Sequence, residues 1–184
     1  MRDLVSNEQE LLKLASQLQT PALAEIYDTY SPGLYRYATR LLGEPGLAED
    51  CVAETFARFL KSLQNGRGPR DHLQAYLYRI AHNWIVDLYR DPEKTCVLSE
   101  ALECEEVTED EAAKHIRQTQ VRKAIRHLTP DQQKVIALKF LEDWNNEEIA
   151  RALQKPIGAI KSIQHRALVS LQKLLTERNH EPSA

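Results

Sequence analysis

Hydrophobic side chains recur at three- and four-residue steps along most of this chain, and that spacing places them on one face of an α-helix. The N-terminal half contains three long patterns of this kind and a shorter one that predicts an accessory helix. They cover residues 23–41, 47–63, 73–88 and, for the shorter pattern, 8–18. Helices with one apolar face bury those faces against one another, so we expect residues 1–90 to form a bundle of three or four helices. None of these patterns includes a catalytic constellation.

Helix-breaking residues divide these patterns. Ser31-Pro32-Gly33 lies inside the first pattern and predicts an interruption of that helix. Glycine and proline at residues 43–46 predict the next turn, and Asn65-Gly-Arg-Gly-Pro69 predicts a loop before the third helix.

Residues 145–168 predict two helices joined by a very short turn. Asn145 is a favourable N-cap, and Glu148 follows at the spacing of a capping box. Pro156 cannot continue the first helix but can stand near the start of the second. One face of the second helix is apolar, and the opposite face is polar and basic, with Lys161, Ser162, His165 and Arg166. This layout is typical of a DNA-reading helix-turn-helix, with an ordinary helical hairpin as the alternative.

The preceding segment predicts further helices of the same unit. Thr129 is a good N-cap, Pro130 occupies the first helical position, and Gln132 completes a second capping box. We expect a four-helix unit from about residue 116 to residue 175, and the whole chain to be all-α.

Composition excludes several classes of protein. The 184 residues allow one or two domains, and no stretch is apolar enough to span a membrane. The N-terminus lacks the apolar segment of a signal peptide, so we expect a cytoplasmic protein. Cys51 lies on an apolar face and is expected in the core, whereas Cys96 and Cys104 lie in an acidic stretch. Three cysteines at these spacings predict no metal site and no disulfide framework, and a redox role for the last two stays open.

The net charge of −3 is unevenly distributed. Residues 91–120 hold 3 basic and 9 acidic side chains, which predicts an acidic connector between two domains. Residues 121–184 hold 11 basic and 7 acidic side chains, so the helix-turn-helix end is positive. Because electrostatic attraction to DNA acts locally, this distribution permits DNA binding, and its modest size indicates that a partner supplies further affinity.

The polar faces of the N-terminal helices also suggest binding. The second long helix is expected to expose Glu49, Asp50, Glu54 and Arg58. The third long helix is expected to expose polar side chains that alternate with aromatic ones. The polar residues are Arg79, His82, Asn83, Asp87 and Arg90, and the aromatic residues are Tyr76, Tyr78, Trp84 and Tyr89. Aromatic rings can stack on unpaired bases while cations follow the phosphates, so this face suits single-stranded DNA.

An enzyme is the weakest alternative. Two acid–base pairs can be proposed, His82 with Asp87 and His72 with Asp71. His82 and Asp87 are five positions apart, however, and side chains on a helix meet best at three or four. No nucleophile, phosphate-binding loop or ligand cluster accompanies them. We therefore expect no catalytic residues, no metal and no cofactor.

The C-terminal unit resembles the fourth domain of sigma-70-type sigma factors. The resemblance rests on five short sequences: Leu128-Thr-Pro, Val135-Ile-Ala-Leu-Lys-Phe, Glu148-Ile-Ala, Gly158-Ala-Ile-Lys-Ser and His165-Arg-Ala-Leu. The chain departs from that family at Gln154, where a glycine is usual, at Ile163, where an arginine is common, and at Ala159, where a threonine is common.

The resemblance extends to the N-terminal domain. Ala48-Glu-Asp-Cys-Val-Ala-Glu-Thr-Phe56 is similar to the polymerase-binding helix of sigma domain 2, with Ala53 where a glutamine is usual. Ala75-Tyr-Leu-Tyr-Arg-Ile-Ala-His-Asn-Trp-Ile-Val-Asp-Leu-Tyr-Arg90 is similar to its promoter-melting helix. Two motifs in this order, with no third domain between them, are typical of the extracytoplasmic-function (ECF) group.

This resemblance implies a domain organisation and a set of partners. Sigma domain 2 would occupy residues 1–90, an acidic linker residues 91–115, and sigma domain 4 residues 116–184. The partners implied are core RNA polymerase, through its beta-prime clamp and beta flap, and promoter DNA in double- and single-stranded form. An anti-sigma factor is a further possible partner, and the protein itself would catalyse nothing.

The resemblance also implies three groups of site residues. Core polymerase would contact Asp50, Glu54, Phe56 and Arg58. The minus-ten element would contact Arg67, Arg70, Arg79, Asn83, Trp84, Asp87 and Arg90. The minus-thirty-five element would contact Pro156, Lys161, Ser162, His165 and Arg166. The connector would enter the RNA exit channel of the polymerase and mimic RNA through Glu100, Glu103, Glu105, Glu106 and Glu109.

A conventional helix-turn-helix regulator remains the alternative from another class. It would explain the C-terminal unit and leave the two N-terminal motifs without a function. The promoter sequence, the regulon, the inducing signal and the oligomeric state of the free protein do not follow from the sequence.

Overall fold

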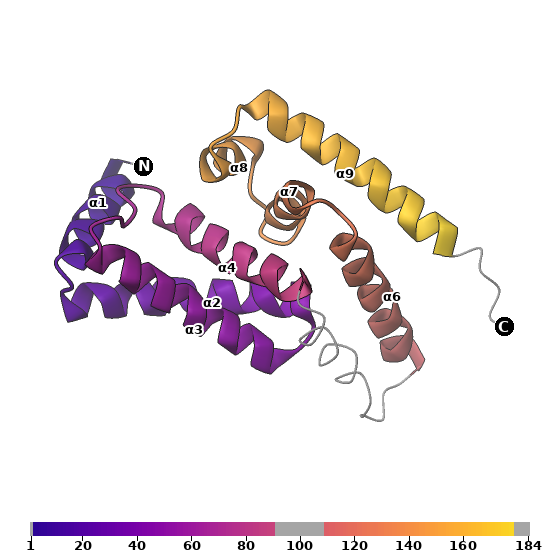
Figure 1. Ribbon diagram of the computed structural model, residues 1–184, viewed down its shortest axis with the longest axis horizontal. Coiled ribbons are helices and arrows are strands. Elements are labelled where there is room, and N and C mark those ends of the chain that lie inside the picture. Colours follow the sequence, from indigo (N-terminus) through magenta and orange to yellow (C-terminus); the bar gives the residue numbers. More distant parts are fainter. Residues whose placement is uncertain (1, 91–108, 179–184) are drawn as a thin grey trace.

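The computed structural model describes residues 2–90 and 109–178, and every regular element in that part of the chain is an α-helix. Figure 1 shows the helices in two groups. The first group contains α1 (Arg2–Ser16), α2 (Thr20–Leu42), α3 (Pro45–Gln64) and α4 (Leu73–Arg90). The second contains α6 (Glu109–Arg126), α7 (Pro130–Phe140), α8 (Asn146–Leu153) and α9 (Ile157–Arg178). Within these residues no helix is long and apolar enough to cross a membrane.

The N-terminal group is a bundle of α2, α3 and α4 with α1 packed against α2 and α3. The apolar positions at three- and four-residue steps form its core, where Tyr37, Phe59, Leu77 and Ile85 are almost fully buried. Cys51 is also buried, and burial raises the pKa of its thiol to about 12. This confirms the expected core role of Cys51.

The predicted interruption of the first long helix is wrong. α2 continues from Thr20 to Leu42 with Pro32 inside it, although an internal proline removes one backbone hydrogen bond and costs about 3 kcal/mol. Packing of buried residues on both sides of Pro32, including Ile26 and Leu34, holds the helix together. The neighbouring Gly33 leaves room for the hydroxyl of Tyr78, because a Cβ atom there would lie 2.8 Å from that oxygen.

The C-terminal group is the expected four-helix unit. Thr129 accepts a hydrogen bond from the Gln132 amide, and Asn145 accepts one from the Glu148 amide, so both predicted capping boxes are confirmed. The first helix of this group, α6, begins at Glu109. The Cys96, Cys104 and connector predictions for residues 91–108 lie outside the described residues.

The two groups of helices pack directly against each other. α4 lies between the α2–α3 pair and α8, and α6 contacts α2 (Figure 1). A single cluster of buried side chains extends from the N-terminal bundle into Leu138, Trp144 and Ile149 of the C-terminal group. The expected division into two domains is therefore accompanied by an interface that the hydrophobic pattern did not predict.

Candidate polymerase and nucleic-acid interfaces

The helix-turn-helix consists of α8, a short turn and α9. Gln154 caps the C-terminus of α8 in the left-handed conformation, with φ of 52°, and its amide bonds back to the Ala150 and Arg151 carbonyls. In the turn, the Lys155 ammonium lies 2.9 Å from the Asp131 carboxylate of α7, which ties the turn to the rest of the unit. The structure therefore places a left-handed residue at the position where the family usually has glycine.

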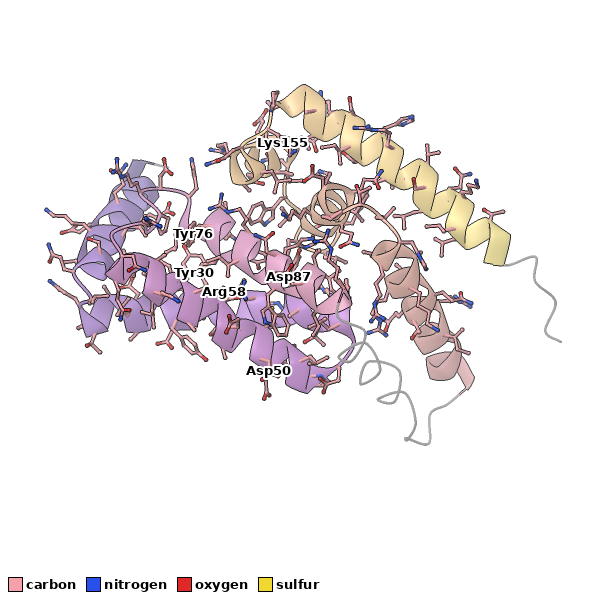
Figure 2. The ribbon with its side chains drawn as sticks, viewed as in Figure 1. Tyr30, Asp50, Arg58, Tyr76, Asp87 and Lys155 are labelled. Atoms are coloured by element: carbon pink, nitrogen blue, oxygen red, sulfur yellow. The ribbon has the colours of Figure 1, made fainter. Side chains whose placement is uncertain are left out.

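The polar face of α9 is open. Ile160, Ile163 and Ala167 are buried against the unit, and the opposite side is exposed. All five residues predicted to contact the minus-thirty-five element are exposed: Pro156, Lys161, Ser162, His165 and Arg166. Figure 2 shows side chains projecting outward along this helix, away from α7. The face can meet a flat or grooved partner without any rearrangement of the unit.

The outer face of α3 combines charge with small apolar side chains. Asp50, Ala53 and Arg58 are exposed there, and Glu54 pairs with Arg58 across one turn at 2.7 Å. Figure 2 shows Asp50 projecting from α3 on the side away from the C-terminal helices. The face therefore stays accessible while the two groups of helices are in contact.

Phe56 lies beneath this face and is only 8% exposed. Its ring packs against Tyr27 of α2, with the ring centroids 4.8 Å apart, and Tyr27 is 49% exposed. Leu60, one turn beyond Phe56, is 36% exposed. Phe56 and Tyr27 both belong to apolar helical patterns, and only the fold shows that Phe56 is buried while Tyr27 is exposed.

The predicted minus-ten residues on α4 form one outward strip. Asn83, Asp87 and Arg90 are exposed, whereas Arg79 and Trp84 are half-buried. The guanidinium of Arg79 lies 5.2 Å from the centre of the Tyr76 ring, a cation–π contact within the same helix. Cationic, amide and aromatic groups thus lie along a single helix face, as single-strand binding requires.

Arg67 and Arg70 lie exposed on the loop that leads into α4. This loop and α4 border a cleft of about 260 Å³ that also touches α8 of the C-terminal group. Its lining contains four arginines and one aspartate: Arg67, Arg70, Arg79, Arg151 and Asp71. The net positive charge of the cleft suits a phosphate-bearing strand.

Tyr78 and Glu142 join α4 to the C-terminal group. The Tyr78 hydroxyl donates a 2.7 Å hydrogen bond to Glu142, and its ring packs on Trp144 with the centroids 5.4 Å apart. Arg40 of α2 donates to the Leu141 carbonyl and lies 3.7 Å from the Glu142 carboxylate. Burial raises the pKa of Glu142, and the Tyr78 and Arg40 partners oppose that shift.

A second contact lies at the other end of the interface. The Arg126 guanidinium stacks 4.7 Å above the ring of Tyr89, whose hydroxyl donates a 2.8 Å hydrogen bond to the Leu41 carbonyl. Arg122 approaches the C-cap of α2 so closely that a Cβ atom at Gly43 would lie 2.3 Å from it. The φ of Gly43 is 78°, and this left-handed backbone favours glycine, whereas the flexible end of the Arg122 side chain can move away from a Cβ atom.

His82 is buried, although it was expected on the exposed face of α4. Its ring is 2% exposed, and its Nδ1 lies 2.6 Å from the Tyr37 hydroxyl. Burial, followed by the positive charge of Lys134 on α7, lowers the pKa of His82 to about 3. A neutral imidazole thus lies at the junction of the two groups, and the acid–base pairing with Asp87 has no support in this arrangement.

The described residues contain no group of three or more histidine, cysteine or acidic side chains arranged to hold a metal ion.

Comparison with known proteins identifies the family of this chain. The family model for sigma-70 region 2 matches residues 26–95, and the model for sigma-70 region 4 matches residues 124–173. The ECF RNA polymerase sigma factor BldN of Streptomyces coelicolor is 32% identical over 173 residues, which cover 91% of this chain and 66% of BldN. The ECF RNA polymerase sigma factor SigL of Mycobacterium tuberculosis is 27% identical over 166 residues, which cover 89% of this chain and 94% of SigL.

Solved structures show the same architecture. CnrH, in complex with the cytosolic domain of CnrY, superposes with a TM-score of 0.65 over 92% of this chain and 97% of CnrH at 22% identity, and supports the fold alone. The sigma factor RpoE of Bartonella quintana, in complex with the anti-sigma factor NepR, matches 79% of this chain and 91% of RpoE at 25% identity, with a TM-score of 0.50. With region 2 and region 4 both present in order, this chain belongs to the sigma-70 family, in its ECF group of RNA polymerase sigma factors.

Proposed function

We propose that this protein binds core RNA polymerase and directs it to specific promoters, as an initiation subunit that catalyses no reaction itself. The main support is that one chain exposes three separate faces. Two are polar, one on α4 with its preceding loop and one on α9, and the third, on α3, is apolar and charged. A conventional helix-turn-helix regulator would need only α9. The relatives named as RNA polymerase sigma factors support the same function.

The outer face of α3 is proposed to dock on the beta-prime clamp of the polymerase. The Glu54–Arg58 pair and Asp50 supply a charged rim, and exposed Ala53 allows close approach. Because Phe56 is buried, we propose that the exposed ring of Tyr27, supported from below by Phe56, supplies the aromatic contact.

The 65–72 loop and the strip on α4, which form the N-terminal side of the cleft, are proposed to receive the minus-ten element once the two groups of helices have separated. Arg67 and Arg70 would meet phosphates or a displaced base, and Trp84 and Asn83 would stack on and hydrogen-bond the unpaired strand. Asp87 and Arg90 continue the strip toward the end of the helix.

The exposed face of α9 is proposed to enter the major groove at the minus-thirty-five element. Lys161 and Arg166 suit guanine edges or phosphates, and Ser162 and His165 lie between them. The Pro156 carbonyl accepts from the Ala159 and Ile160 amides at the start of α9, and the positive N-terminal end of this helix would favour a phosphate there. The beta flap is proposed to hold this unit in place on the polymerase.

The two groups of helices must separate on the promoter. The names of the two elements imply centres about 25 base pairs apart, which is about 85 Å of duplex at 3.4 Å per base pair. A helix as long as α9, with 22 residues, spans only about 33 Å at 1.5 Å per residue. We therefore propose that the compact form is the unbound one and that an anti-sigma partner would favour the compact form.

Paired substitutions on the two DNA faces test these assignments. The full chain is combined with purified core polymerase, and initiation is measured on templates whose minus-ten or minus-thirty-five element is scrambled. We expect Lys161→Ala with Arg166→Ala to remove the response to the minus-thirty-five sequence, with about 1–3 kcal/mol lost for each base contact. Arg67→Ala with Arg70→Ala should instead reduce opening at the minus-ten element.

Arg117→Ala with Lys123→Ala on α6 is the matched control, because it also removes two exposed cations but lies on neither DNA face. Equal losses of initiation in all three double variants would show that only the net positive charge matters. That result would refute the assignment of separate DNA-reading faces.

A further inference from the structure

The α1 helix caps α4 from a distance of 65 positions in the sequence. The backbone amide of Leu73, the first residue of α4, donates a 2.6 Å hydrogen bond to a carboxylate oxygen of Glu8. The Tyr76 amide bonds to the His72 carbonyl at 3.0 Å, which identifies His72 as the N-cap residue of α4. Neither family motif in the sequence includes Glu8, and the pattern over residues 8–18 predicted only an accessory helix.

This cap replaces one that His72 cannot provide. An N-cap residue normally has extended backbone and uses its own side-chain oxygen to accept from the first turn. His72 instead has a φ of 52°, a left-handed conformation that costs a residue with a side chain about 1–2 kcal/mol. The Glu8 side-chain oxygen, which accepts from the Leu73 amide, supplies the missing acceptor at this strained start of the helix.

The cap fixes one end of the loop that bears Arg67 and Arg70. The other end is fixed by the Arg67 amide, which donates a 2.8 Å bond to the Ser62 carbonyl, and by Gly66, whose φ is 65°. The loop has no regular helix of its own, so its shape depends on these two attachments. A cleft of about 450 Å³ separates α1 from the loop, and only the Glu8 contact ties Leu73 to α1 by a hydrogen bond among the described residues.

α1 is itself firmly placed. Leu12 and Ala15 are buried against α2 and α3, and Glu8 lies one turn before Leu12 on the same side of the helix. Glu8 is half-buried and approaches Tyr30 of α2; burial, and then the charge of Glu8, raises the pKa of Tyr30. A rigid carboxylate in this position can hold the start of α4 at a fixed place.

We propose that Glu8 is a positioning residue for promoter opening: its carboxylate holds Leu73 and thereby sets the shape in which the 65–72 loop meets the minus-ten element. The inference rests on the proposed minus-ten role of that loop. Glu8 contacts no DNA in this scheme. It acts through the Leu73 amide and the loop that ends there.

Glu8→Ala, Glu8→Gln and Glu10→Ala test the proposal in the full chain bound to core polymerase. Glu10 is exposed on the same helix and serves as the matched control, whereas glutamine at position 8 retains a carbonyl acceptor. Open-complex formation is followed by permanganate reactivity of thymines in the minus-ten element, and polymerase affinity is measured separately. Hydrogen exchange of residues 66–76 reports the loop directly.

We expect Glu8→Ala to slow opening about threefold to tenfold, the loss that removal of a helix cap of about 1 kcal/mol predicts. Exchange at residues 66–76 should rise, polymerase affinity should stay within about twofold, and Glu8→Gln should recover most of the rate. Opening at the parent rate in Glu8→Ala, or equal defects in Glu8→Ala and Glu8→Gln, would overturn the proposal.

Arg67→Ala with Arg70→Ala separates this inference from the function on which it rests. Parent-like opening in that double variant refutes the minus-ten role of the loop, whatever Glu8 does. A defect there combined with normal opening and normal exchange in Glu8→Ala refutes the positioning role alone.

Discussion

The 2.7 Å hydrogen bond from the Tyr78 hydroxyl to the Glu142 carboxylate links α4 to the helix-turn-helix domain. Both groups are largely withdrawn from water, so loss of one partner leaves the other poorly satisfied. The contact belongs to the compact form, and the proposed function on a promoter requires that it break.

Tyr78→Phe should shift the free protein toward an open form. Removing a hydrogen bond to a charged group should weaken the interface by about 1–3 kcal/mol, because Glu142 then loses its hydrogen bond from Tyr78 and keeps the longer 3.7 Å contact with Arg40. Energy transfer between dyes on α3 and α9, or the radius of gyration from X-ray scattering, measures the separation. Tyr76→Phe is the control, since Tyr76 packs on Phe59 within the N-terminal bundle. Identical distances in the two variants would show that Tyr78 does not hold the domains together.

Charge exchange on α3 separates polymerase docking from helix stability. Glu54→Arg should abolish co-purification with core polymerase, as should the double variant Glu54→Arg with Arg58→Glu, although the double variant restores the ion pair within α3. An exposed pair of this kind contributes only about 0.3–0.5 kcal/mol to stability, so both proteins should fold normally. Recovery of polymerase binding in the double variant would mean that only the intrahelical pair matters.

Gln154→Gly should stabilise the helix-turn-helix. Gln154 has a φ of 52°, which glycine adopts without steric cost, so the free energy of unfolding should rise by about 0.5–1 kcal/mol. Gln172→Gly, on the exposed face inside α9, should lower it by a similar amount, because glycine is unfavourable within a helix. Urea unfolding of the two variants checks these opposite signs, and a loss of stability in both would contradict the strain assigned to Gln154.

Stability should fall as the pH drops below the ordinary pKa of histidine. The pKa of His82 is lowered to about 3 by burial and by the nearby Lys134, so between pH 6.5 and about 3 the unfolded chain binds a proton that the folded chain does not. The neutral imidazole therefore contributes its full stability above pH 6.5. By pH 5 the loss should be about 2 kcal/mol at 1.36 kcal/mol per pH unit.

Urea unfolding between pH 7.5 and 5 measures this slope in the parent and in His82→Phe, which keeps an aromatic ring beside Tyr37. The variant should have a flatter profile over the same range. A profile as steep as that of the parent would assign the pH dependence to other groups.

The helical pattern and its capping residues predicted much of this fold. Thr129 and Asn145 form the expected capping boxes because capping is a local interaction, decided by residues three positions apart. Pro32 misled the prediction because its effect on α2 depends on packing against other helices, which no local pattern contains. The exposed face of α9 followed from helical periodicity and is present in the structure.

The features of the site that the sequence did not predict depend on contacts between residues far apart in the chain. Tyr27 and Phe56 differ in exposure only because α2 and α3 pack together, so their roles could not be distinguished in sequence. His82 is buried because α4 meets both α2 and the C-terminal group. Glu8 and Leu73 are 65 positions apart, and no spacing rule connects an acidic residue in one helix with the first amide of another.

Run-off transcription with purified core polymerase, with and without this chain, tests the proposed function most directly. On a library of promoter fragments, the chain should produce new start sites that require both a minus-ten and a minus-thirty-five element, and the chain alone should give little or no gel shift. Absence of new start sites, together with tight binding of the isolated chain to a palindromic site, would contradict the proposal and indicate a conventional helix-turn-helix regulator.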